Sequence, residues 1–195
     1  MKNLLFVSFY VVILLPIAAQ AGPFGLDMGM SLNDVDPDAS QAAPGVYTTT
    51  KVPNPHSAFE QYAIKIGPKS GLCWIKAIGK DISTSRYGVE LKSAFNEMKE
   101  RLERGYGENI TTDMLFPRSI WNEPEDFMMG MLKKERFLMA VWDEDSGAQL
   151  RENIVQIGLV ASALRTTTGY LSVEYSFSNK SACDGEIEEM QDDVL

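Results

Sequence analysis

Apolar and polar residues alternate most clearly near the C-terminal end of the chain. Between residues 171 and 177, large apolar side chains occupy every second position, with serine or glutamate between them. This period of two predicts a strand with one buried face and one wet face. The apolar run over 153–164 lacks a clean period, and we interpret it as a strand because a turn sequence follows it. Similar reasoning predicts further strands over 22–30, 45–52, 59–66, 71–82 and 136–143.

The strongest helical pattern lies between residues 87 and 105. Its apolar side chains recur at the spacing of one continuous helical stripe: Leu91, Phe95, Met98 and Leu102. A capping-box sequence from Ser31 to Asp34 predicts a short helix, followed by a loop over 36–44. Helices are also predicted over 124–134 and 182–192. Together these elements predict an α+β fold, with a mostly antiparallel sheet and about three helices packed on one face.

The first 21 residues have the pattern of a cleavable signal peptide. Lys2 precedes an uncharged apolar run over 4–15, and Ala19 and Ala21 form an A-x-A cleavage site. A transmembrane anchor is the alternative, but it needs roughly 20 apolar residues. We therefore expect a periplasmic or secreted protein, without a stable membrane anchor, whose single globular domain spans 22–195.

The charge of the chain restricts the classes of partner. The full chain has a net charge of −9, and residues 1–21 contribute one lysine and no acidic residue to it. The remaining chain is therefore still more acidic, and no basic stripe interrupts it. An acidic surface repels the phosphates of nucleic acids, so a nucleic-acid partner is not expected.

The two cysteines, Cys73 and Cys183, are predicted to form a disulfide, because a lone pair in an exported protein is usually oxidised. Two buried free thiols are the alternative. The alternation within 71–82 places Cys73 on the same strand face as Ile75 and Ala77, which we assign to the core.

Few residues offer catalytic chemistry. His56 is the only histidine, and a hydrolase would have to use it with the adjacent Ser57 or a carboxylate. An ordinary loop histidine is the simpler interpretation. The cysteines lack C-x-x-C spacing, and neither a glycine-rich nucleotide motif nor a calcium-loop sequence is present. We therefore expect no cofactor and no metal site.

Methionine and aromatic residues gather between 121 and 142. Met128 and Met131 are soft thioethers of the kind that bind Cu(I), but their spacing also fits packing inside a helix. Trp121 and Phe127, together with these methionines, are candidates for an exposed patch that contacts a partner. Burial in the core is the default alternative for all four side chains.

Several short motifs resemble a family of small, uncharacterised exported bacterial proteins. They are the GLDMGMSL segment from Gly25 to Leu32, the Pro55-His56-Ser57 turn followed by Phe59, the GLCWI segment from Gly71 to Ile75, and the helix from Tyr87-Gly88 to Tyr106-Gly107. The strand–GMS–helix opening is more distantly similar to outer-membrane assembly lipoproteins and β-lactamase-inhibitor-like modules. Those modules bind proteins without catalysis, and the chain lacks the lipoproteins' cysteine at the cleavage site.

The sequence therefore favours an exported, non-enzymatic binding module that recognises a protein or envelope component through a sheet face or its loops. An exported hydrolase that uses His56 is the alternative.

Overall fold

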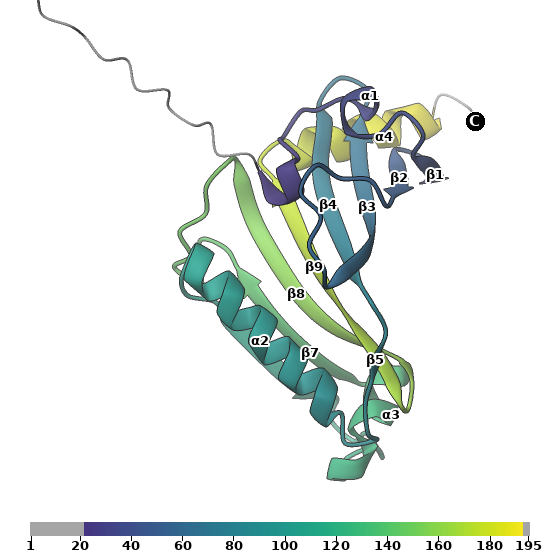
Figure 1. The fold of residues 1–195 in the computed structure, drawn as a ribbon, viewed down its shortest axis with the longest axis vertical. Helices are drawn as coiled ribbons and strands as arrows, with labels where there is room; N and C mark the ends of the chain where they lie inside the picture. Colours follow the sequence, from purple (N-terminus) through teal and green to yellow (C-terminus); the bar gives the residue numbers. More distant parts are fainter. Residues whose placement is uncertain (1–21, 193–195) are drawn as a thin grey trace, which may run out of the picture.

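The protein is described by a computed structural model that covers residues 22–192; the predicted signal peptide lies outside these described residues. One nine-stranded sheet runs through them in the order β1-β2-β3-β4-β9-β8-β7-β6, and β5 also pairs with β9 (Figure 1). Every pairing between described strands is antiparallel. The strands are β1 (Ser40–Ala43), β2 (Val46–Thr49), β3 (Phe59–Gly67), β4 (Gly71–Gly79), β5 (Ile82–Ser83), β6 (Ile110–Leu115), β7 (Arg136–Trp142), β8 (Ile154–Arg165) and β9 (Thr168–Phe177).

The helices complete an α+β fold, as the sequence predicts. The described α-helices are α1 (Leu32–Val35), α2 (Val89–Tyr106), α3 (Phe127–Leu132) and α4 (Lys180–Asp192), and the short 3-10 helices are η1 (Pro23–Gly25) and η2 (Pro124–Asp126). Figure 1 shows α2 lying along the sheet, where it contacts β8 and β9, and α4 at the other end of the sheet beside β3 and β4.

The main core fills the side of the sheet that carries α2 and α3, which we name the inner face. Leu91 and Phe95 of α2 and Phe127 of α3 are buried there against Ala77, Val173, Leu159 and Ala140, which align across four neighbouring strands. The stripe predicted over 87–105 is therefore the face of α2 that packs on the sheet. The opposite side of the sheet is named the outer face.

Helix α4 lies on the outer face, so the prediction that the helices share one face is wrong. Lys65 of β3 and Trp74 of β4 are paired residues whose neighbours Ile64 and Ile75 point into the core. Because side chains alternate along a strand, Lys65 and Trp74 point to the outer face. There Lys65 forms an ion pair with Asp184 of α4, and Trp74 packs on a small apolar cluster that α4 completes.

The N-terminal segment differs from its prediction. Residues 22–30 do not form a strand, because Phe24 and Gly25 adopt left-handed backbone angles within η1. The segment instead reaches the sheet through two backbone hydrogen bonds, from Gly29 N–H to the Leu72 carbonyl and from Leu72 N–H to the Met30 carbonyl. The capping box at Ser31 is confirmed and begins α1. The loop predicted over 36–44 contains β1, which pairs with β2.

Candidate functional site

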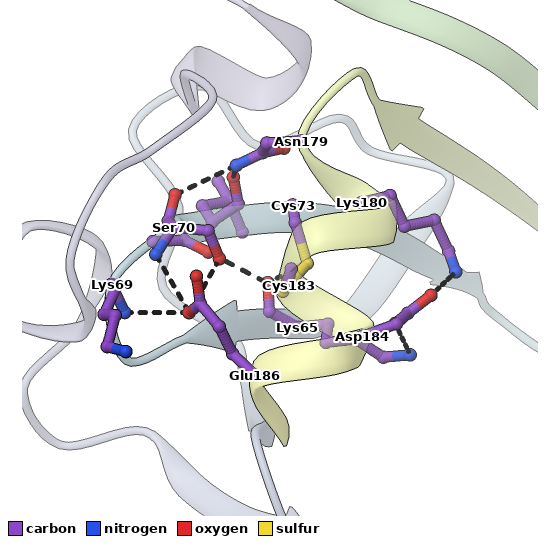
Figure 2. Close-up of a disulfide and its surroundings, with 11 residues drawn as sticks. Lys65, Lys69, Ser70, Cys73, Asn179, Lys180, Cys183, Asp184 and Glu186 are labelled. Carbon is purple, nitrogen blue, oxygen red and sulfur yellow. Dashed lines mark hydrogen bonds and ion pairs between the residues drawn. A yellow bond between two sulfur atoms is a disulfide. The ribbon is translucent and has the colours of Figure 1, made fainter. Parts of the chain in front are cut away.

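The predicted disulfide between Cys73 and Cys183 is present and links β4 to α4 (Figure 2). Cys73 is the extra residue of a β-bulge, because β3 pairs Lys65 with Trp74 but Ile66 with Leu72. The bulge interrupts the alternation that placed Cys73 beside Ile75 and Ala77. Cys73 belongs instead to a separate cluster with Cys183, Ile187 and Trp74, which corrects the predicted core position.

Glu186 of α4 holds the turn between β3 and β4 (Figure 2). Its Oε2 atom accepts hydrogen bonds from the backbone N–H groups of Lys69 at 2.8 Å and Ser70 at 3.0 Å, and from the Ser70 hydroxyl at 3.1 Å. These donors favour the ionised carboxylate, so they lower the pKa of Glu186, with the Lys69 N–H contributing most. The Oε2 atom of this carboxylate is thus committed to the turn.

Polar contacts on both sides of the disulfide complete this attachment. Asp184 accepts from Lys65 at 2.7 Å and also from Lys180; burial opposes ionisation, but these hydrogen bonds outweigh it and lower the pKa of Asp184. Asn179 donates to the carbonyls of Ser70 and Leu72 at 2.9 and 3.1 Å. We name α4 together with these contacts the C-terminal clasp. Its polar side chains serve to hold the helix on the sheet.

The predicted patch of Trp121, Phe127, Met128 and Met131 does not form a surface. Phe127, Met128 and Met131 are 1%, 0% and 6% exposed and belong to the main core. Trp121 is half-buried beside Gly130 of α3. These three side chains of α3 are buried because the helix packs on β7 and β8, whereas Leu132 at its end is exposed. The thioethers of Met128 and Met131 therefore fill the core and face no partner.

His56 lines a cleft of about 310 Å³ between the start of β3 and the middle of α2. Asp81 and Glu97 also line it, together with the basic side chains of Lys80 and Arg101. The Nδ1 atom of His56 accepts a hydrogen bond from the backbone N–H of Ala58 at 3.1 Å. The cleft therefore brings the imidazole and two carboxylates into one region.

The hydrogen bonding of His56 differs from that of a nucleophile relay. A relay needs the Nδ1 proton to be held by a carboxylate while Nε2 accepts from the nucleophile. Here Nδ1 is an acceptor, so the neutral ring carries its proton on Nε2. Within residues 22–192 no hydrogen bond joins Ser57 to His56. The contacts of His56 are those of a residue that stabilises a turn.

The outer face of β6, β7 and β8 is the one large apolar region that sequence reasoning missed. Six side chains form it, and we name them the outer strip: Ile110, Met114, Phe137, Met139, Val141 and Val160. They lie side by side because Ile110 pairs with Val141, Met114 with Phe137, and Met139 with Val160. The inner-face helices contact these strands from the other side, and α4 contacts β3 and β4. Over residues 22–192, no helix covers the outer strip.

The outer strip is accessible as well as apolar. Ile110 and Met114 are 51% and 44% exposed, and the β7 side chains are half-buried. Next to it, Phe116 is 45% exposed and its ring contacts that of Phe137, with 5.3 Å between centroids. The signal in the sequence is that residues 137–142 are apolar on both faces of the strand, whereas an ordinary surface strand alternates.

Comparison of the chain with protein-family models, with curated proteins and with solved structures finds no match. The resemblance to exported bacterial proteins therefore stays a prediction. Among residues 22–192, no helix has both the length and the apolar composition needed to cross a membrane. Over the same residues, no group of three or more His, Cys, Asp or Glu side chains is arranged to hold a metal ion.

Proposed function

We propose that the protein is an exported, non-enzymatic binding module that recognises a protein or other envelope component through the outer strip. The observation that carries this proposal is an apolar sheet face without a covering helix among the described residues. Contiguous apolar surface of this kind marks interaction sites in soluble proteins, because leaving it in water is unfavourable.

The contrast between the two ends of the sheet supports the proposal. At the β3–β4 end, α4 buries the outer face and is fixed there by the disulfide. At the β6–β8 end, β7 presents Phe137, Met139 and Val141 between its two paired neighbours, and no helix within residues 22–192 covers them. Methionine is well suited to this position, because its flexible side chain adapts to the shape of a partner.

The remaining features agree with an exported binding protein. A disulfide between buried cysteines is compatible with an oxidising compartment. The alternative, a hydrolase that uses His56, has a cleft with two carboxylates but lacks the hydrogen bonds of a relay. The binding proposal is therefore the better supported of the two.

Capture from envelope extracts tests the proposal with matched variants. The chain without residues 1–21 is immobilised as wild type, as Met139→Lys with Val141→Lys, and as Val89→Lys. Val89 is 57% exposed on α2, so its replacement by lysine controls for the added charge. We expect a component that wild type and Val89→Lys retain and the strip variant loses, at unchanged melting temperatures. Equal retention by all three proteins would contradict a binding role for the strip.

A further inference from the structure

The two edges of the nine-stranded sheet are built differently. The edge strand β1 has four residues, is polar, and contains a register irregularity between Gln41 and Ala43. Short strands and bulges are the usual means by which a sheet edge avoids pairing with another chain. The edge at β1 is therefore protected.

The other edge, β6, has none of these protections. It has six residues, pairs with β7 in unbroken register, and contains no lysine, proline or glycine. Its outer-face residues Ile110 and Met114 are exposed and belong to the outer strip. A regular edge of this kind, with apolar residues at both ends of its outer face, presents unpaired backbone N–H and C=O groups to a further strand.

We propose that the strand that pairs with β6 is β6 of a second copy of the chain, antiparallel to it across a two-fold axis at Thr112. In this register Thr112 faces Thr112 of the other copy, and Ile110 faces Met114. On the inner face Thr111 faces Asp113, so a neutral side chain, whose hydroxyl donates to Asn109 of its own chain at 2.7 Å, lies opposite each carboxylate. Residues 110–114 of β6 are thus complementary to themselves, which an isologous interface requires.

Like-charge repulsion and the length of β6 favour this register over the registers whose axis is shifted by one residue. Opposed residues in an antiparallel pair must share a face, so the axis can move only in steps of one residue along β6. An axis at Asp113 would place two carboxylates directly opposite each other, which is unfavourable. An axis at Thr111 would leave residues 113–115 without opposite residues inside the strand, whereas the axis at Thr112 leaves only Leu115 without one. With the axis at Thr112, each Asp113 keeps its ion pair to Arg136, at 2.8 Å.

Pairing of the two edges would join the outer strips of both copies into one apolar surface. This inference goes beyond the proposed function, because it concerns assembly and holds whether or not a further partner binds. A foreign strand could satisfy the backbone of β6 equally well. The self-complementary order of apolar, threonine and acidic positions is what favours a second copy.

Cysteine crosslinking tests the register directly. Opposed residues in an antiparallel pair have Cα atoms about 4.5–5.5 Å apart, within the range that a disulfide spans. Both native cysteines are already bonded, so a new cysteine is the one free thiol. We expect Thr112→Cys to form a covalent dimer under mild oxidation. The control Thr111→Cys should not form one, because the Thr111 positions of the two copies are offset by two residues, roughly 7 Å, along the paired strands.

Sedimentation of the chain without residues 1–21 tests the assembly. We expect a dimer that strengthens with salt, because salt screens the repulsion between two acidic copies. Thr112→Lys should weaken dimerisation about ten-fold or more, since it places two like charges face to face. A monomer at all concentrations, or crosslinking of Thr111→Cys in preference to Thr112→Cys, would overturn the proposal. Those results would leave capture by the outer strip untouched, so the two proposals fail separately.

Discussion

Removing the disulfide should lower the stability of the whole chain. The bond joins residues 110 positions apart, and it restricts the unfolded chain most strongly when the enclosed loop is long. For a loop of about 100 residues, the chain-entropy relation gives about 4.7 kcal/mol at 25 °C. In a protein of this size each kcal/mol changes the melting temperature by about 2–4 °C, so a loss of roughly 9–19 °C is expected.

The variant of choice is Cys73→Ala combined with Cys183→Ala. Both cysteines are fully buried, so a reductant reaches the bond in the native protein only slowly, whereas the double variant removes it completely. Thermal and urea unfolding, followed by circular dichroism, compare the variant with wild type. The spectra of the folded proteins should coincide, because Glu186, Asp184 and Ile187 still hold α4 on the sheet.

Two results would refute this reasoning. A loss below about 1 kcal/mol would show that the unfolded chain gains little freedom when the bond is absent. Selective loss of amide protection in Lys180–Asp192, with the rest of the sheet unchanged, would show that the bond only attaches α4 locally.

Three further predictions follow from individual side chains. Glu186 has a lowered pKa in the folded protein. Its contribution to stability is therefore present above the ordinary glutamate pKa of about 4.3 and is lost as the pH falls through the lowered value. Glu186→Gln should flatten the acid side of the stability profile, measured by urea unfolding. Burial raises the pKa of the Tyr175 hydroxyl above its ordinary value of about 10. The unfolded chain therefore ionises at this residue first, and the free energy of unfolding should fall as the pH rises above about 10. Tyr175→Phe should remove this alkaline loss of stability, and an unchanged slope would contradict the prediction. His56→Ala removes the acceptor for the Ala58 N–H and should cost about 1 kcal/mol in thermal unfolding. Loss of a measurable ester hydrolysis without loss of stability would instead favour the hydrolase alternative.

Elements with strong local patterns could be predicted from the sequence. The helical stripe through Leu91 and Phe95 gives α2, and the alternation over 171–177 gives the core of β9, because in both segments the period alone separates buried from exposed positions. The two edge strands β1 and β6 could not be recognised. Residues 40–43 are small and polar, and they become a strand only because β2 lies beside them.

The two faces of the sheet were harder to predict than its strands. A period of two tells which residues share a face, but not which face a helix covers, so α4 was placed on the wrong side. The β-bulge at Cys73 shifts the alternation by one residue, and nothing in the GLCWI sequence marks that shift. The outer strip was missed because β6 was not recognised, so the sequence did not show which side chains of β7 lie beside it on an exposed face.

The C-terminal clasp also determines when folding of the chain can be completed. The central strands β4 and β9 pair residues as distant as Ile75 and Tyr175, and Cys183 lies beyond both. Neither the middle of the sheet nor the disulfide can therefore form until nearly the whole chain has been synthesised. Long-range pairing of this kind folds slowly and leaves apolar strands unpaired in the meantime. Oxidation of the two cysteines would therefore mark the end of folding.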